Sequence, residues 1–175
     1  MQTANLKIRR FNDADFDDFA ELIRDKMASE YAIYDHPFPT DDDALKKILD
    51  YFSSTDEFYA VELIEANKVI GYLVLNKCGE KGVRNLGYCI NSQYHGKGYG
   101  TEAVNEIIRY AKEELKIYKL VTGTAKNNIP SVRLLSAVGF KKVGENIDSF
   151  AKDENGNPIE FIGYSYEMLL ADDPV

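Results

Sequence analysis

The sequence predicts a mixed α/β domain, of the α+β kind, whose central sheet is mostly antiparallel. Short apolar runs typical of strands alternate with apolar residues spaced three to four apart, which is typical of helices. Residues 85–125 read as strand, glycine-rich loop, helix and strand, the order of a βαβ unit. Asn155-Gly156-Asn157-Pro158 separates two strand-like runs near the C-terminus and predicts a hairpin.

The chain is long enough to bury one sizeable core. It has 175 residues, of which 45% are apolar. A domain of this size buries roughly 70% of the surface of its extended chain. Because no repeat, linker or low-complexity segment interrupts the sequence, we expect a single domain over residues 1–175.

The first part of the chain predicts a strand followed by two helices. The strand is expected at residues 6–11, and Asn12 or Asp13 caps the helix after it. Thr40 is expected to cap the second helix. The apolar residues expected to face the core from these helices are Phe16, Phe19, Ile23, Met27, Leu45, Ile48, Leu49 and Phe52.

The rest of the chain adds strands and two more helices. The strands are expected at residues 58–65, 69–77, 85–91, 119–125, 141–152 and 159–170, which makes about seven in all. One helix follows the glycine-rich loop, with Val104, Ile107, Ile108, Ala111 and Leu115 on its apolar face. The last helix begins after Asn128, and Gly139 is placed to cap its C-terminus.

The glycine-rich loop carries the clearest chemical signal. It reads Gln93-Tyr94-His95-Gly96-Lys97-Gly98-Tyr99-Gly100-Thr101. Three glycines in five residues allow a tight bend and let a ligand approach the backbone closely. The helix behind them offers unpaired N–H groups and a positive dipole end, so the loop is predicted to bind phosphate.

Two common phosphate-binding motifs do not fit this loop. The P-loop pattern G-x-x-x-x-G-K-[S/T] does not occur in the chain. The dinucleotide fingerprint needs a third glycine where Thr101 stands, and an acidic residue about 20 residues later, where the chain reads Lys119-Leu120-Val121-Thr122. The pattern Gln-x-x-Gly-x-Gly remains, and an ordinary strand-to-helix turn is its alternative explanation.

A second motif follows the next predicted strand. It reads Asn127-Asn128-Ile129-Pro130-Ser131-Val132-Arg133-Leu134-Leu135-Ser136-Ala137-Val138-Gly139-Phe140. Together with Gln93 to Gly98, this segment resembles the GNAT superfamily of acetyl-CoA-dependent N-acetyltransferases, whose motifs are Q/R-x-x-G-x-G/A and N-x-x-[A/S]-x-x-L-x-x-x-x-G-F. Leu86-Gly87-Tyr88, Ser131 and the chain length look most like the branch that acetylates the N-termini of ribosomal proteins.

The resemblance implies acetyl-CoA as cosubstrate and a sheet with helices on both faces. Two central strands, at residues 85–91 and 119–125, would splay apart and hold the pantetheine arm as an added strand. One backbone N–H near the end of the first strand would serve as oxyanion donor. The expected cofactor-binding residues are Cys89, Ile90, Asn91, His95, Gly96, Lys97, Gly98, Tyr99, Gly100, Thr101, Asn128 and Ser131. For His95, a plain solvent-exposed position is the alternative.

Ser131 and Asp148 are the candidate catalytic residues. By resemblance, the Ser131 hydroxyl would donate to the cofactor sulfur, although a bond to local backbone is the alternative. The family's usual acid and base positions hold Asn85, Gly123 and Leu135, so Asp148 on the penultimate strand, Glu30 and Tyr88 are left as candidates for proton transfer. Cys89 lies within an apolar strand and is expected to be an inert thiol rather than an acyl carrier.

The acceptor is predicted to be a primary amine, on a small molecule or a protein N-terminus, that attacks directly in a ternary complex. Because no usual base position holds a carboxylate, an α-amine with a pKa near 8 is favoured over a lysine amine near 10.4. The loop at residues 29–39 is expected beside the acceptor, and it carries Glu30, Tyr31, Tyr34, Asp35 and His36. A CoA-binding module with little or no catalysis is the alternative.

Composition disfavours other classes of function. The formal net charge of −8, from 21 basic and 29 acidic side chains, argues against nucleic-acid binding. No apolar stretch has membrane length, and no signal peptide is predicted. Two cysteines and two histidines without ligand spacing predict reduced thiols and no metal. We therefore expect a cytoplasmic monomer or homodimer without a nucleic-acid, membrane or metal partner.

Overall fold

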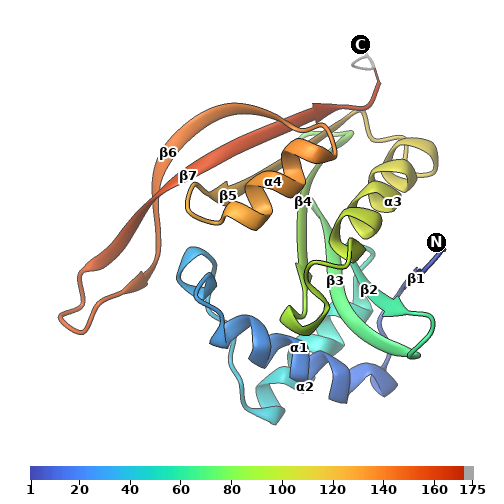
Figure 1. Ribbon diagram of the computed structural model, residues 1–175, viewed down its shortest axis with the longest axis horizontal. Coiled ribbons are helices and arrows are strands. Elements are labelled where there is room, and N and C mark those ends of the chain that lie inside the picture. Colours follow the sequence, from blue (N-terminus) through green and yellow to red (C-terminus); the bar gives the residue numbers. More distant parts are fainter. Residues whose placement is uncertain (172–175) are drawn as a thin grey trace.

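The computed structural model describes residues 1–171, which form a seven-stranded mixed sheet (Figure 1). The strand order is β1-β2-β3-β4-β5-β7-β6, and within these residues only β4 and β5 pair in parallel. The strands are β1 (Leu6–Arg9), β2 (Phe58–Leu63), β3 (Lys68–Lys77), β4 (Val83–Ile90), β5 (Lys119–Ala125), β6 (Lys141–Lys152) and β7 (Pro158–Leu169). The predicted sheet and its central βαβ unit are confirmed.

Helices cover both faces of the sheet, as expected (Figure 1). Two helices lie on each face: α1 (Phe16–Ala28) and α2 (Asp42–Ser54) on one, α3 (Tyr99–Glu113) and α4 (Ile129–Ala137) on the other. Three single-turn 3₁₀ segments lie in the connections of the described chain, η1 (Asp13–Asp15), η2 (Ala32–Tyr34) and η3 (Ser92–Tyr94). None of the helices within residues 1–171 combines the length and apolar character needed to cross a bilayer.

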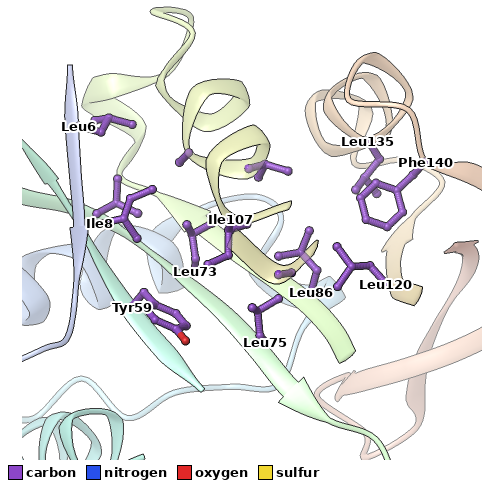
Figure 2. Packing of buried hydrophobic residues seen from close by; sticks show 14 of the residues in the cluster. Leu6, Ile8, Tyr59, Leu73, Leu75, Leu86, Ile107, Leu120, Leu135 and Phe140 are labelled. Atoms are coloured by element: carbon purple, nitrogen blue, oxygen red, sulfur yellow. The ribbon is translucent and has the colours of Figure 1, made fainter. Parts of the chain in front are cut away.

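Each face of the sheet has its own core. Successive side chains of a strand point to opposite faces, so Leu73 and Leu75 of β3 enter one core while Tyr72 and Val74 enter the other. The α3–α4 core, part of which is shown in Figure 2, includes Leu6, Ile8, Leu73, Leu75, Leu86, Ile107, Leu120, Leu135 and Phe140. The α1–α2 core includes Phe11, Phe19, Leu22, Ile23, Leu45, Leu49, Phe52, Tyr72 and Val74.

Several predicted details of the helices need correction. Asp41, not Thr40, caps α2, because its Oδ1 accepts the Ala44 backbone N–H at 2.9 Å. Leu115 lies beyond the end of α3 and is 37% exposed, so it is not part of the buried face. Asn12 does cap the first helical segment, but that segment is η1, and α1 follows it directly.

Candidate active site

The two central strands separate partway along their length. Residues 83–85 of β4 pair with residues 119–121 of β5, and the described strands do not pair beyond that point. At the fork, Thr122 on β5 donates from Oγ1 to the Leu86 carbonyl at 2.8 Å. β4 then continues to Ile90, while β5 pairs along its other edge with β7. The splayed pair expected from the resemblance is therefore present.

The antiparallel β3–β4 ladder decides which backbone groups of β4 face the gap. The Asn91 N–H donates to the Ile70 carbonyl on β3 at 2.8 Å. Hydrogen-bonded and non-bonded pairs alternate along such a ladder, so the backbone of Cys89 also faces β3, whereas that of Tyr88 and Ile90 faces the gap. The N–H groups of Tyr88 and Ile90 are therefore the ones that a strand-like ligand in the gap can meet.

The glycine-rich loop has the backbone conformation that a phosphate loop needs. Gly96 has φ +74° and Gly98 has φ +85°, values that side-chain-bearing residues rarely adopt. A Cβ at either position would meet nothing within 4 Å, so the space beside the loop is open. Gly98 begins α3 without a side-chain cap, which leaves the N–H groups of the first turn, at residues 99–101, for a ligand. The loop fits a pyrophosphate.

The third glycine of the loop serves packing instead. Gly100 lies in the first turn of α3, and a Cβ there would come within 3.1 Å of Leu134 Cδ1 and 3.8 Å of Ile90 Cγ1. Its lack of a side chain lets α3 approach α4 and the end of β4. The neighbouring Tyr99 is half-buried against the α3–α4 core.

Helix α1 holds the start of the loop in place. Asn91 is 2% exposed, and its side chain donates to Glu21 Oε1 at 3.1 Å and accepts the Gln93 N–H at 3.0 Å. The Ser92 backbone N–H donates to Asp25 Oδ2 at 2.8 Å. The side chain of Asn91 thus helps to fix the loop between β4 and α1.

His95 and Lys97 are both exposed but differ in their contacts. The His95 Nε2 lies 2.7 Å from the Ile90 carbonyl, and because a carbonyl can only accept, the ring nitrogen donates. Lys97 lies with Nζ 5.3 Å from the centre of the Tyr94 ring. His95 therefore contacts the end of β4, and Lys97 carries a positive charge beside the glycines.

The start of α4 brings Ser131 to β4. Asn128 caps the helix, as predicted, and its Oδ1 accepts the Ser131 backbone N–H at 3.3 Å. The Ser131 Oγ is hydrogen-bonded to the Tyr88 hydroxyl at 2.7 Å. Burial raises the pKa of Tyr88 to about 12. This pair joins α4 to the edge of β4 that faces the gap. In the sequence, the alternation of side chains along a strand indicates only that Tyr88 shares a face with Leu86.

Leu135 and Cys89 are both turned away from this pair. Leu135 has no exposed surface and packs in the α3–α4 core, so this position offers no proton donor. Cys89 packs against the opposite, α1–α2 core, and burial raises the pKa of its thiol to about 12. A thiol with that pKa is a poor nucleophile near neutral pH.

The loop at residues 29–39 packs against the β6–β7 hairpin. In Figure 1 the segment after α1 rises toward these two strands. Tyr34 contacts Phe161 with ring centres 5.1 Å apart, and His36 contacts Phe150 at 4.4 Å. The aromatic contacts connect the loop, which the resemblance places beside the acceptor, to the strands that follow α4.

Asp148 lies on this hairpin rather than beside Ser131. It sits opposite Phe161 in the β6–β7 register, is half-buried, and accepts a hydrogen bond from the Asn146 side chain. A Cβ on Gly163 of β7 would collide with the Asp148 carboxylate, so the glycine provides the space that this side chain occupies. The structure does not bring Asp148 into contact with Ser131, and its link to the loop at residues 29–39 runs through Phe161, whose ring contacts Tyr34.

A cavity of about 260 Å³ lies at the other end of β4. It is lined by Arg10, Asp56, Glu57, Tyr59, Leu75, Lys77, Arg84, Tyr110 and Leu115. Lys77 binds Asp56 at 2.8 Å, so part of its charge is neutralised internally. None of the predicted site residues lines this cavity, and the fork between β4 and β5 remains the candidate site. Among the residues that the structure describes, no group of three His, Cys, Asp or Glu side chains is placed to hold a metal ion.

Comparison with known proteins agrees with this geometry. The GNAT acetyltransferase domain family matches residues 5–141. The uncharacterized N-acetyltransferase YnaD of Bacillus subtilis is 28% identical over 142 residues, covering 81% of this chain and 82% of that protein.

Two solved structures share the fold. The ribosomal-protein-S5-alanine acetyltransferase from Vibrio fischeri matches with a TM-score of 0.82 and 18% identity, over 98% of this chain and 97% of the other. Spermidine N-acetyltransferase from Vibrio cholerae, in complex with CoA and spermine, matches with a TM-score of 0.77 and 18% identity, over 96% and 97%. The family match covers most of the chain, which therefore belongs to the GNAT family of acetyltransferases.

Proposed function

We propose that this protein transfers an acetyl group from acetyl-CoA to a primary amine, by direct attack in a ternary complex. The fork between β4 and β5 carries the proposal, because the N–H groups of Tyr88 and Ile90 face the gap that runs from this fork toward the phosphate-type loop. Bound acetyl-CoA supplies an activated thioester carbonyl to this gap. The protein's own residues must bind the cosubstrate, stabilise the oxyanion and receive the acceptor amine.

The protein holds the cosubstrate mainly through its backbone. The first-turn N–H groups of α3, at residues 99–101, bind the pyrophosphate, and Lys97 adds a positive charge beside them. The pantetheine arm pairs with the free edge of β4 as an added strand would. Of the residues expected to contact the thioester arm through their backbone, Ile90 is the one whose N–H faces the gap and can act as oxyanion donor, because the backbone of Cys89 and Asn91 faces β3.

The acceptor approaches from the side of the loop at residues 29–39. Spermidine N-acetyltransferase and the ribosomal-protein alanine acetyltransferase share this fold and are named for amine acceptors of different size. Here Asp35 is bound to Lys26 at 2.6 Å, so Glu30 and Asp148 are the carboxylates left to attract a cationic amine. Since the candidate base positions Asn85 and Gly123 carry no titratable group, water takes the amine proton, which favours an α-amine.

A matched pair of peptides tests this proposal. One peptide keeps a free N-terminus and has its lysine blocked, and the other has the N-terminus blocked and the lysine free. CoA release is followed with a thiol reagent, and mass spectrometry locates the acetyl group. We expect faster transfer to the α-amine, with kcat/KM rising from pH 7 to pH 9 as more of the amine becomes neutral.

Two results would contradict the proposal in different ways. Transfer to lysine alone, with none to any α-amine, would overturn the acceptor class and would require a side-chain base in place of water. Tight CoA binding without acceptor-dependent CoA release from any amine would instead support a CoA-binding module. Acetyl-CoA without acceptor is the control for hydrolysis.

A further inference from the structure

Among the described residues, the bond between Tyr88 and Ser131 is the one side-chain hydrogen bond that joins β4 to α4. Tyr88 lies on the α3–α4 face of the sheet, and its backbone borders the gap between β4 and β5. Ser131 stands in the first turn of α4, where the Asn128 cap fixes its backbone N–H. The two hydroxyls therefore meet at 2.7 Å at the edge of the proposed thioester site.

The direction of this hydrogen bond follows from the acidity of the two hydroxyls. A phenol is the stronger acid of the two and hence the better donor, while a serine hydroxyl has both a proton and two lone pairs. When Tyr88 donates to Ser131 Oγ, the serine proton is free to point elsewhere. A donor chain of this kind also polarises the second hydroxyl and strengthens the bond that it makes.

We propose that Tyr88 is a positioning residue, which donates to Ser131 and so directs the serine proton to the sulfur that leaves as thiolate. The inference rests on the proposed acetyl transfer. In that step the amine nitrogen bonds to the acetyl carbon, the C–S bond breaks, and its electron pair goes to sulfur. The amine proton goes to water, while Ser131 and Tyr88 keep their protons and stabilise the thiolate as hydrogen-bond donors.

Full proton transfer from Tyr88 is disfavoured by its surroundings. Burial is the main reason that its pKa lies near 12, and Tyr166 on β7 raises the pKa further, while the Ser131 hydrogen bond lowers it. In the described chain these are the neighbours that shift Tyr88, and neither is a carboxylate or a cation. A thiol has a pKa near 8.5, so a proton on sulfur rather than on Tyr88 would be disfavoured by roughly three orders of magnitude.

A double-mutant cycle separates this role from a structural one. Because Tyr88 acts through Ser131, we expect Tyr88→Phe to lower kcat about tenfold and Ser131→Ala to lower it about tenfold to a hundredfold, with CoA affinity unchanged in both. The double variant should be no slower than Ser131→Ala alone. The matched control is Tyr110→Phe, which removes a tyrosine hydroxyl from the same α3–α4 core at the other end of β4 and should retain kcat.

The pH profile gives a second, independent readout. Since Tyr88 stays protonated, the ratio of wild-type to Tyr88→Phe activity should be constant between pH 7 and pH 9. A ratio that falls across this range would mean that Tyr88 loses its proton there, and would overturn the donor role. Unchanged kcat in Tyr88→Phe, or additive losses in the double variant, would also overturn the inference. If the wild-type protein acetylates no amine, the proposed function and this inference both fail. If the wild type is active and Tyr88→Phe is equally active, only the inference fails.

Discussion

Replacing Gly98 by valine tests the phosphate loop with a measurable magnitude. Gly98 has φ +85°, and a Cβ added there meets no protein atom within 4 Å. The added Cβ therefore causes no clash inside the protein, and the expected effect on folding is the strain of a branched residue in the left-handed region, about 2 kcal/mol. For a domain of this size, that strain lowers Tm by about 4–8 °C.

The same side chain would stand in the open space where the pyrophosphate is proposed to lie. We therefore expect CoA affinity to fall at least tenfold, equivalent to about 1.4 kcal/mol, when measured by calorimetry below the unfolding transition. Gly156→Val is the matched control, because Gly156 has φ +82° and equally open space in the β6–β7 turn. It should lose similar stability but bind CoA normally. Unchanged CoA affinity in folded Gly98→Val protein would refute the placement of the pyrophosphate.

Two further predictions concern β4. Gly71 of β3 lies opposite Ile90, and a Cβ there would collide with the Cys89 carbonyl. Gly71→Ala should therefore destabilise the fold by about 1–3 kcal/mol, measured by urea unfolding, and lower the rate of CoA release by shifting the edge of β4. Unchanged stability and rate would contradict this. Burial favours the neutral Cys89 thiol and raises its pKa to about 12. At pH 8, iodoacetamide should therefore label exposed Cys78 much faster than half-buried Cys89, and mass spectrometry that finds equal labelling rates on native protein would contradict this.

Much of the fold could be predicted because local signals and packing agree. The spacing of the apolar residues predicted all seven strands of the described chain. The strand predicted at residues 119–125 has the bounds that the structure shows for β5. The errors occur at helix ends, where neighbouring residues fit the same local pattern equally well. Thr40 and Asp41 are both good helix caps, and the structure uses Asp41 because its carboxylate reaches the Ala44 N–H. Leu115 keeps the helical spacing but follows the last residue of α3.

The site was less predictable because it depends on contacts between distant segments. The glycines and Asn128 could be identified from their own chain neighbours, since turns and caps are local features. The Tyr88–Ser131 bond joins residues 43 positions apart, and no local pattern specifies it. Which β4 N–H groups face the gap depends in turn on the β3 register, which only the folded sheet reveals.

The most direct test of acetyl transfer in a ternary complex is the initial-rate pattern with both substrates varied. CoA release would be measured over a grid of acetyl-CoA and α-amine peptide concentrations, and reciprocal rates plotted against reciprocal concentration at each fixed level. Direct attack predicts lines that intersect, because both substrates are bound before the acetyl group moves. Parallel lines would indicate an acetylated enzyme intermediate, and a rate independent of peptide would show that no acetyl reaches the amine.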